Sequence, residues 1–379
     1  MEDRLTILMT TDTGGGVWTY SMELCKALKQ EGVFIHLAAM GTWPTKEQEE
    51  EAASLENVLL YKSDFKLEWM QDPWEDIDQA EKWLNAIYHT VQPDILHFNN
   101  YAHRNEDWSC PTVTVFHSCL QTWWQAVKGT SAPAVWGKYT SLVSESLNSS
   151  NVVVAPTKAI LKKAAAAHSI SPETRVIYNG KDMELSEEIF EKEDFILCMG
   201  RLWDEAKNLG SLSGIAKELP WPVYVVGNNI NPNTGEEVFI ENVKFLGELP
   251  QEEAEQWLQR AKIFVSPTKY EPFGVAILEA AASGCALVLN ELDTLTELWQ
   301  DTAVFFDPEN KAEARELILQ LIENESFRND IAKKAKERAT NFSAERMAAA
   351  YAETYRKLLK KRDLNWTSGR RRRKNHPQT

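Results

Sequence analysis

Cysteines are few in this sequence, and none is spaced as a disulfide framework or a zinc site requires. The five cysteines lie far apart along 379 residues and form no C-x-x-C pair. This pattern predicts free thiols in a reducing compartment, so we expect a cytoplasmic protein. The sequence also lacks an apolar run of the roughly 18 residues that cross a bilayer. Its first residues lack the basic segment and the cleavage site of a secretory signal.

The sequence has fewer basic than acidic residues, 41 Lys and Arg against 56 Asp and Glu. The formal net charge is −15, and it becomes −20 when the five cations of Arg370–Lys374 are set aside. Because nucleic-acid binding depends on cations that neutralise phosphates, a body this acidic argues against a nucleic-acid partner. The basic tail leaves two interpretations open. It is either a solvated terminus attracted to the acidic body or a segment that associates weakly and peripherally with an anionic membrane surface.

Short apolar runs alternate with amphipathic stretches in both halves of the sequence. Two successive series of this kind predict an α/β protein with two Rossmann-like parallel-sheet domains facing a central cleft. The expected strands are Leu5–Met9, Phe34–Ala38, Asp94–Phe98, Thr112–Phe116, Val152–Ala155, Phe195–Gly200, Val223–Gly227, Lys262–Ser266, Ala286–Leu289 and Ala303–Phe306. The main expected helices are Val17–Gln30, Trp74–Val91, Thr157–His168, Ala206–Glu218, Glu252–Arg260, Val275–Ser283, Ala312–Asn324 and Ala344–Leu359.

Domain boundaries follow from where this alternation pauses. An Asn-Gly pair and an acidic stretch after it indicate a junction near residue 182. We expect an N-terminal Rossmann-like domain over residues 1–182 and a C-terminal Rossmann-like domain over residues 183–343. A C-terminal helix over 344–362 is expected to pack back toward the first domain, and residues 363–379 are expected to be a disordered basic tail.

A glycine run follows the first expected strand. Backbone N–H groups of Gly14-Gly15-Gly16 can approach a phosphate at the start of the next helix. A dinucleotide site is disfavoured, because Thr19 replaces the third glycine of G-x-G-x-x-G and Met40-Gly41-Thr42 offers no carboxylate for a ribose. No G-x-x-x-x-G-K-[ST] motif is present, which excludes a P-loop. The run is therefore either a tight turn or a phosphate contact of another kind.

The second half carries a more specific set of residues. Arg201 and Lys207 follow the first strand of that half, where two cations can hold a diphosphate. The segment from Glu271 to Glu279 leads from a strand into a helix that opens near Gly274. A helix N-terminus supplies free N–H groups and a partial positive charge. Together these residues predict a site for a phosphorylated nucleotide at the cleft.

At these residues the sequence resembles the family 4 glycosyltransferases, which are retaining enzymes of the GT-B fold that use nucleotide-sugar donors. The resemblance extends from Leu5 to about Leu359, and Glu-Pro-Phe-Gly within a Glu-x7-Glu spacing is its most specific motif. Supporting motifs are Gly-Gly-Gly-Val-Trp at 14–18, Val-Phe-His at 115–117, Val-Ile-Tyr-Asn-Gly at 176–180, and Gly-Arg at 200–201 with Lys207. One departure is Asn208, which stands where the family usually has a glycine after the lysine.

The resemblance implies that the domain over residues 1–182 is the acceptor domain and the domain over residues 183–343 the nucleotide-sugar donor domain. It also implies a role for each matched residue. Arg201 and Lys207 would grip the donor diphosphate. Glu279 would bind the ribose, Glu271 would lie beside the transferred sugar, and His117 would lie near the hydroxymethyl group of that sugar. The other donor contacts that the resemblance implies are Gly15, Gly16, Phe273, Gly274 and Val275.

Two alternatives concern individual residues. His97 also ends an expected strand, so it competes with His117 for the role at the cleft. Asp76-Ile77-Asp78 has the form of a metal-binding Asp-x-Asp motif. It starts a helical pattern, however, where carboxylates are explained by the helix dipole, and no strand delivers it to the cleft. We therefore expect no metal and no cofactor other than the donor itself.

These observations predict a metal-independent glycosyltransferase that moves a hexose from a nucleotide diphosphate sugar to a hydroxyl of a carbohydrate or another acceptor. A UDP-sugar is favoured and glucose is the default, while retention follows only from the resemblance. Two rivals stay open: a nucleotide-sugar epimerase or hydrolase of the same fold, and a catalytically silent module that binds sugar nucleotides. Incubation with the donor alone separates the first rival, since a transferase hydrolyses its donor only slowly.

Overall fold

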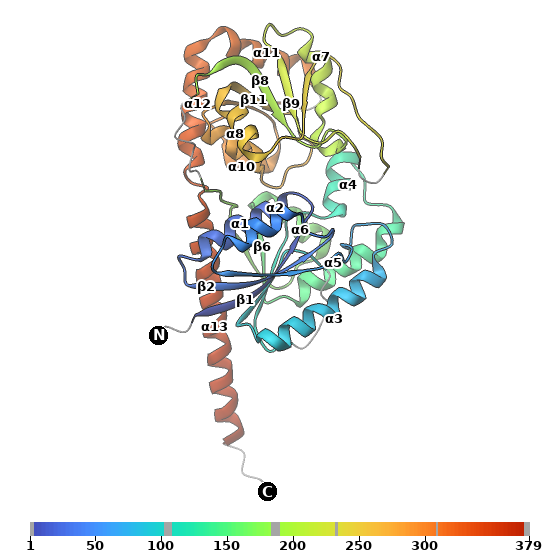
Figure 1. Cartoon of the computed structure of the whole chain (residues 1–379), viewed down its shortest axis with the longest axis vertical. Coiled ribbons are helices and arrows are strands. Elements are labelled where there is room, and N and C mark those ends of the chain that lie inside the picture. The colour runs from blue at the N-terminus through green and yellow to red at the C-terminus, as the bar shows by residue number, and fades with distance from the viewer. Residues whose placement is uncertain (1–3, 102–107, 183–189, 232–233, 308–309, 375–379) are drawn as a thin grey trace.

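The computed structural model describes residues 4–101, 108–182, 190–231, 234–307 and 310–374, with the side chains of residues 365–374 left out. Two parallel sheets lie one above the other, each covered by helices, and the last helix runs beside the N-terminal sheet (Figure 1). The predicted α/β fold with two Rossmann-like sheets is therefore confirmed. The predicted junction at residue 182 borders residues 183–189, which lie outside the described part.

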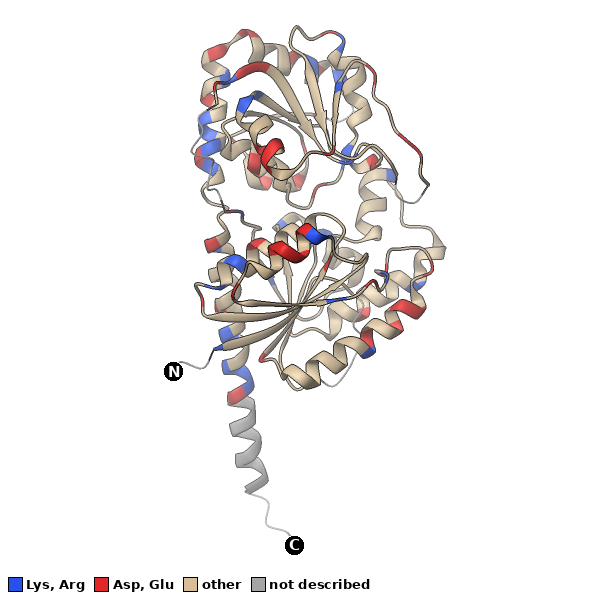
Figure 2. Cartoon of the chain, viewed as in Figure 1, with Lys and Arg blue, Asp and Glu red and all other residues tan. Residues whose placement is uncertain are grey.

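The N-terminal sheet has seven strands in the order β3-β2-β1-β4-β5-β6-β7, all parallel. Its strands are β1 (Leu5–Asp12), β2 (Val33–Met40), β3 (Val58–Lys62), β4 (Ile95–Phe98), β5 (Thr112–Val115), β6 (Val152–Ala155) and β7 (Glu173–Val176). Its helices are α1 (Gly16–Leu28), α2 (Lys46–Ala53), α3 (Trp74–Val91), α4 (Leu120–Lys128), α5 (Gly137–Ser149) and α6 (Lys158–His168), with a short 3₁₀ turn η1 (Ala134–Trp136). Strands β2, β4, β5 and β6 carry no charged residue, as Figure 2 shows, because helices bury both faces of the sheet.

The C-terminal sheet has six parallel strands in the order β10-β9-β8-β11-β12-β13. Its strands are β8 (Glu193–Met199), β9 (Val223–Val226), β10 (Lys244–Gly247), β11 (Ala261–Ser266), β12 (Ala286–Asn290) and β13 (Val304–Phe306). Its helices are α7 (Leu212–Ala216), α8 (Gln251–Arg260), α9 (Val275–Ala282), α10 (Asp293–Trp299), α11 (Lys311–Glu323) and α12 (Glu325–Ala339). In each sheet the order of the strands reverses near the centre, between β1 and β4 in the first and between β8 and β11 in the second. Ligands of such folds bind where the strand order reverses, at the carboxyl ends of the strands.

The predicted long helix over 206–218 is wrong. The segment instead forms two 3₁₀ turns, η2 (Glu205–Lys207) and η3 (Leu209–Ser211), followed by the short α7. Asn208 stands between the turns with φ +53°, a left-handed conformation that stops a continuous helix. Its amide is held by a bond from Nδ2 to the carbonyl oxygen of Pro267, 3.0 Å away. The break follows directly after Lys207, one of the predicted site residues.

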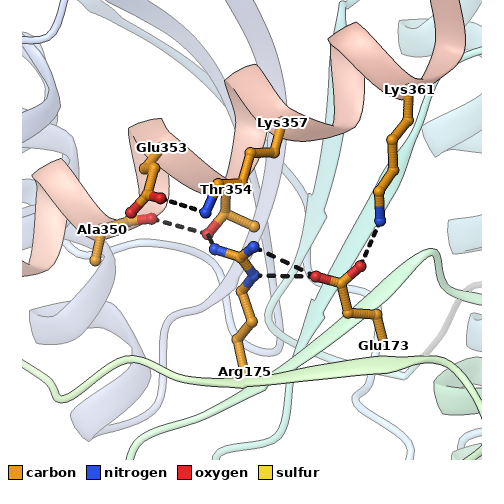
Figure 3. A network of polar contacts seen from close by, with 7 residues as sticks. All are labelled: Glu173, Arg175, Ala350, Glu353, Thr354, Lys357 and Lys361. Atoms are coloured by element: carbon orange, nitrogen blue, oxygen red, sulfur yellow. Dashed lines mark hydrogen bonds and ion pairs between the residues drawn. The ribbon is translucent and has the colours of Figure 1, made fainter. Parts of the chain in front are cut away.

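Helix α13 (Ala344–Lys374) returns from the C-terminal domain to the N-terminal one. Its buried residues, including Tyr351 and Tyr355, belong to the same core as α1 and the strands of the first sheet. At its exposed edge Lys361 pairs with Glu173 of β7 at 2.6 Å (Figure 3). Arg175 of β7 bonds to Thr354 Oγ1 at 3.3 Å. The last helix therefore ties the C-terminal end of the chain to the first domain.

The backbone of residues 363–374 continues α13 to Lys374. The disorder expected of the basic tail stays a prediction. Residues 375–379 lie outside the described part. Among the helices that the structure describes, none combines the length and the apolar character needed to cross a membrane.

Side-chain contacts join the two domains beside the strand reversal. Thr122 of α4 and Tyr270, which follows β11, share a hydrogen bond of 2.8 Å between their hydroxyl oxygens. The carboxylate of Glu297 accepts bonds of 2.9 Å from the backbone N–H groups of Lys158 and Ala159, at the N-terminus of α6. A carboxylate is favourable at that position because the helix dipole is positive there. These contacts hold the strand ends of the two sheets facing each other.

Candidate functional site

Four segments converge where the two sheets face each other. They follow β1, β4, β8 and β11, the strands at which the strand order reverses. Gly15, after β1, has φ +105° and precedes α1 as its N-cap. A Cβ built on Gly15 would lie 4.0 Å from Nη1 of Arg201, which follows β8 in the other domain. The guanidinium of Arg201 therefore approaches the glycine turn from the other domain.

Each of the two predicted cations has a carboxylate partner. Arg201 Nη2 lies 2.7 Å from Asp204 Oδ2, and half of the Arg201 side chain (51%) stays exposed. Lys207 Nζ lies 2.6 Å from Glu271 Oε2, and both of those side chains are largely buried. The structure thus brings three predicted residues from two loops to the same end of the sheet. An anion that enters here would compete with carboxylates that already hold the cations in place.

The N-terminus of α9 faces the same region. Gly274 caps this helix with φ +89°, and a Cβ there would lie 2.9 Å from Ile277 Cδ1 and 3.3 Å from Glu271 Cγ, so glycine is required. Phe273 is buried in the core of the second domain, and Val275 is the first helical residue. N–H groups in a first turn have no acceptor within their own helix. The N–H of Ile277 bonds to Gly274 O at 3.0 Å, and those of Val275 and Ala276 have no backbone acceptor among the described residues, so they can donate to a ligand beside Glu271.

Glu279 lies one turn inside α9, and its carboxylate is engaged by a residue that the sequence analysis missed. Lys181 Nζ forms an ion pair with Glu279 Oε1 and lies 3.7 Å from Glu255 Oε1. Burial lowers the pKa of Lys181, but these carboxylates outweigh burial and raise the pKa above its usual value. A ribose at Glu279 would share the carboxylate with this ammonium. The only signal for Lys181 in the sequence is its place directly after the Val-Ile-Tyr-Asn-Gly motif.

The two candidate histidines have different environments. His97 is fully buried, with Nδ1 2.6 Å from the hydroxyl of Tyr355 and Nε2 3.2 Å from Oδ1 of Asn99. His117 follows β5, is only partly buried, and bonds through Nε2 to the same Asn99 oxygen at 2.9 Å. Burial lowers the pKa of His117 to about 3, so the imidazole is neutral at physiological pH. Both ring nitrogens of His97 are already bonded, whereas Nδ1 of His117 has no hydrogen-bond partner in the part of the chain that the structure describes.

Asp12 and Glu68 are buried carboxyl groups that the sequence analysis missed. Burial raises the pKa of Asp12 to about 7, although the N–H of Gly14 and the nearby Arg201 act to lower it. Burial also raises the pKa of Glu68 to about 7, and the proximity of Asp12 adds to that rise. Asp12 ends β1 directly before the glycine run, and this position was the signal that could have identified it.

Replacing Asp12 with asparagine is expected to stabilise the protein more at pH 8 than at pH 5. The folded-state pKa of about 7 lies above the ordinary value of 3.8, so the parent loses stability as pH rises through that interval. Asparagine has no charge to desolvate, and its carbonyl can still accept from Gly14. The stabilisation of the variant relative to the parent is expected to be larger at pH 8 than at pH 5 by on the order of 2 kcal/mol, because one pKa unit corresponds to about 1.4 kcal/mol. Urea unfolding at both pH values measures it, and an equal gain at both would contradict the burial of an ionising Asp12.

The Asp76-Ile77-Asp78 motif lies away from these segments. Asp76 is in the first turn of α3, and its Oδ1 accepts from the backbone N–H of Lys66 at 3.3 Å. Among the described residues, no group of three or more His, Cys, Asp or Glu side chains is placed to hold a metal ion.

Comparison with known proteins gives matches in both domains. The family model for glycosyltransferase family 4 matches residues 14–185, and the model for glycosyl transferases group 1 matches residues 180–338. A Campylobacter jejuni N,N'-diacetylbacillosaminyl-diphospho-undecaprenol alpha-1,3-N-acetylgalactosaminyltransferase is 28% identical over 182 residues, 45% of this chain and 46% of that protein. The Escherichia coli O-antigen chain mannosyltransferase B is 29% identical over 116 residues, 31% of this chain and 30% of the relative. The matched segments thus span less than half of these two relatives.

Solved structures share the fold over nearly the whole chain. Sucrose-phosphate synthase from Thermosynechococcus elongatus superposes with a TM-score of 0.73 at 16% identity, covering 94% of this chain and 99% of that one. Anabaena HepE in complex with UDP-glucose superposes with a TM-score of 0.68 at 18% identity, covering 92% and 99%. The two family models together extend from residue 14 to residue 338, and their boundary falls between the two sheets. The chain therefore belongs to the family 4 glycosyltransferases and has the GT-B fold.

Proposed function

We propose that the protein transfers a hexose, by default glucose, from a nucleotide diphosphate sugar to an acceptor hydroxyl, with retention at the anomeric carbon and without a metal ion. The observation that carries this proposal is the position of Arg201 in the second domain, whose Nη1 lies 4.0 Å from the place that a Cβ on Gly15 of the first domain would take. Lys207 and the N-terminus of α9 supply further positive charge on the same side of the cleft.

The chemistry follows from where negative charge develops. As the glycosidic bond breaks, charge grows on the outer phosphate of the leaving nucleotide diphosphate. Fixed cations and a helix N-terminus stabilise that charge without reorganising, and one such donor is worth about 3 kcal/mol by analogy with oxyanion holes. The departing phosphate oxygen then takes the acceptor proton on the same face of the sugar. Glu271, held by Lys207, would lie beside the sugar and tolerate its positive character.

The proposed donor and the proposed acceptor rest on different observations. A UDP-sugar is favoured because HepE, which shares the fold, was solved with UDP-glucose. The acceptor would bind on the side of the N-terminal domain, where Asp12 and His117 lie. The two relatives act, by their names, on different acceptors, so we propose only a carbohydrate or another hydroxyl-bearing acceptor.

Chelation tests the metal-independent mechanism. With an excess of EDTA, the parent enzyme is expected to keep its full rate of sugar transfer, because protein cations neutralise the leaving diphosphate. A panel of nucleotide diphosphate sugars and acceptors, followed by detection of the released nucleotide and the glycosylated product, measures the rate. Loss of activity that added Mn²⁺ or Mg²⁺ restores would contradict this mechanism. Donor turnover without an acceptor would favour a hydrolase or an epimerase, and binding without turnover would favour a silent module.

Cytoplasmic location and weak peripheral membrane association stay predictions. Two described cations of α13 have acidic partners in the first domain: Arg356 pairs with Glu31, and Lys361 with Glu173. The run Arg370–Lys374 would then be the segment that contacts an anionic surface, which co-sedimentation with phosphatidylglycerol vesicles can measure.

A further inference from the structure

Asn99 connects the two histidines, and its orientation can be deduced. Its amide nitrogen Nδ2 lies 2.9 Å from the backbone carbonyl oxygen of Thr10, and its Oδ1 lies on the side of His97 and His117. A carbonyl oxygen can only accept a hydrogen bond, so the NH₂ group must face Thr10. Turning the amide around would bring two oxygens together. The Asn99 oxygen therefore faces both imidazole rings.

This orientation fixes the tautomer of each ring. An amide oxygen only accepts, and it can accept two bonds, so Nε2 must carry the proton in both His97 and His117. In His97 the remaining nitrogen, Nδ1, accepts from the hydroxyl of Tyr355 at 2.6 Å. Burial raises the pKa of Tyr355 well above its usual value, so that hydroxyl keeps its proton. In His117 the remaining Nδ1 has no hydrogen-bond partner among the residues that the structure describes.

Two tyrosines of helix α13 hold the residues that surround His117. Tyr355 holds His97, which shares the Asn99 oxygen with His117. Tyr351, one turn earlier, bonds to the hydroxyl of Tyr20 at 2.6 Å. The ring of Tyr20 packs edge-on against His117, with 4.6 Å between ring centroids. The last helix thus restrains the side chains that surround His117.

We propose that Asn99 is a positioning residue: its amide oxygen holds His117 as the tautomer protonated at Nε2, which leaves Nδ1 to accept a hydrogen bond from a hydroxyl group of the bound sugar. Burial keeps this ring neutral, so it binds as an acceptor and does not act as a proton donor at Nδ1. The inference rests on the proposed function for the identity of the ligand, whereas the tautomer is a property of the protein alone. Asn99 follows β4 at the strand reversal, where a ligand is expected.

Nitrogen NMR of the protein labelled with ¹⁵N-histidine tests the tautomer without any substrate. Long-range ¹H–¹⁵N correlations distinguish a protonated from an unprotonated ring nitrogen, and the His117 signals are identified by their loss in His117→Gln. We expect Nε2 protonated and Nδ1 unprotonated in the parent at pH 7. A proton on Nδ1, or a mixture of the two tautomers, would overturn the proposal whether or not the enzyme proves active.

The Asn99→Ala variant tests the cause. It is expected to leave His117 as a mixture of tautomers, whereas His168, which bonds to Cys119 and Ser144, keeps its own pattern. Asn57→Ala is the matched control, since Asn57 is a buried asparagine that bonds to the carbonyls of Cys25 and Val33, away from the cleft. An unchanged His117 pattern in Asn99→Ala would overturn the role of Asn99.

Kinetics add a second readout. If His117 accepts a bond from the sugar, Asn99→Ala should lower kcat/KM roughly tenfold, the effect of one hydrogen bond of about 1.4 kcal/mol. Adding this change to His117→Ala should lower kcat/KM no further, because Asn99 acts through the imidazole. Additive losses would contradict that route. Absence of any turnover in the parent would count against the proposed function and would leave the tautomer result standing.

Discussion

Replacing Arg201 or Lys207 with alanine is expected to lower the turnover number by two orders of magnitude or more. Each substitution removes a fixed positive charge from the side where the leaving diphosphate would lie. The transition state would lose about 3 kcal/mol of stabilisation, by analogy with an oxyanion-hole donor. Lys207→Ala also leaves Glu271, which is largely buried, without its ion-pair partner at 2.6 Å. Initial rates at saturating donor and acceptor measure the effect.

Two cations outside the cleft provide matched controls. Arg260 pairs with Glu193 at 2.6 Å, and Lys262 pairs with Asp194. Both pairs lie at the opposite ends of β8 and β11 from Arg201 and Glu271. Arg260→Ala and Lys262→Ala are therefore expected to keep turnover within about twofold of the parent, since surface ion pairs contribute little. Near-normal turnover in both Arg201→Ala and Lys207→Ala would rule out the proposed charge stabilisation.

Gly180→Ala is expected to lower the free energy of unfolding by roughly 3 kcal/mol or more, because overpacking at a backbone contact forces the chain apart. A Cβ on Gly180 would lie 2.1 Å from the carbonyl oxygen of Ser343. Beside it the backbone N–H of Lys181 bonds to Phe342 O at 3.1 Å, and that of Ala344 bonds to Lys181 O at 3.2 Å. These bonds join the segment after the first sheet to the start of α13. Urea unfolding followed by circular dichroism measures the loss.

Gly214→Ala is the control for that substitution. Gly214 lies in α7, and a Cβ there would meet no atom within 4 Å. Alanine favours helix over glycine by up to about 1 kcal/mol, so this variant is expected to be as stable as the parent or slightly more so. Equal stability of Gly180→Ala and the parent would contradict the close backbone contact between Gly180 and Ser343.

The boundary errors of the sequence analysis have identifiable causes. Helices α2 (Lys46–Ala53) and α12 (Glu325–Ala339) were missed, because both are rich in charge and show only a weak apolar periodicity. The edge strands β3 and β10 were missed because they are short and only partly buried. The predicted helix over 206–218 was wrong, because the left-handed Asn208 is stabilised by Pro267, which is far away in the sequence. Local patterns carry no information about such a partner.

The order of amino acids was enough to predict the α/β class, the two sheets and the end of each sheet at which ligands should bind. It was enough because strands buried on both faces must be continuously apolar, and because loops at their carboxyl ends carry the polar residues. The motifs at Gly14–Gly16, Gly200–Arg201 and Glu271–Glu279 also carry the resemblance to the family.

Which polar groups meet depends on the folded chain. It paired Lys181 with Glu279, raised the pKa of Asp12 by burial, and gave His97 and His117 a common partner in Asn99. These contacts join residues up to 98 positions apart, and Tyr355 reaches His97 across 258. Desolvation and hydrogen-bond geometry depend on where the folded chain brings such residues together, and the order of amino acids along the chain does not specify those distances.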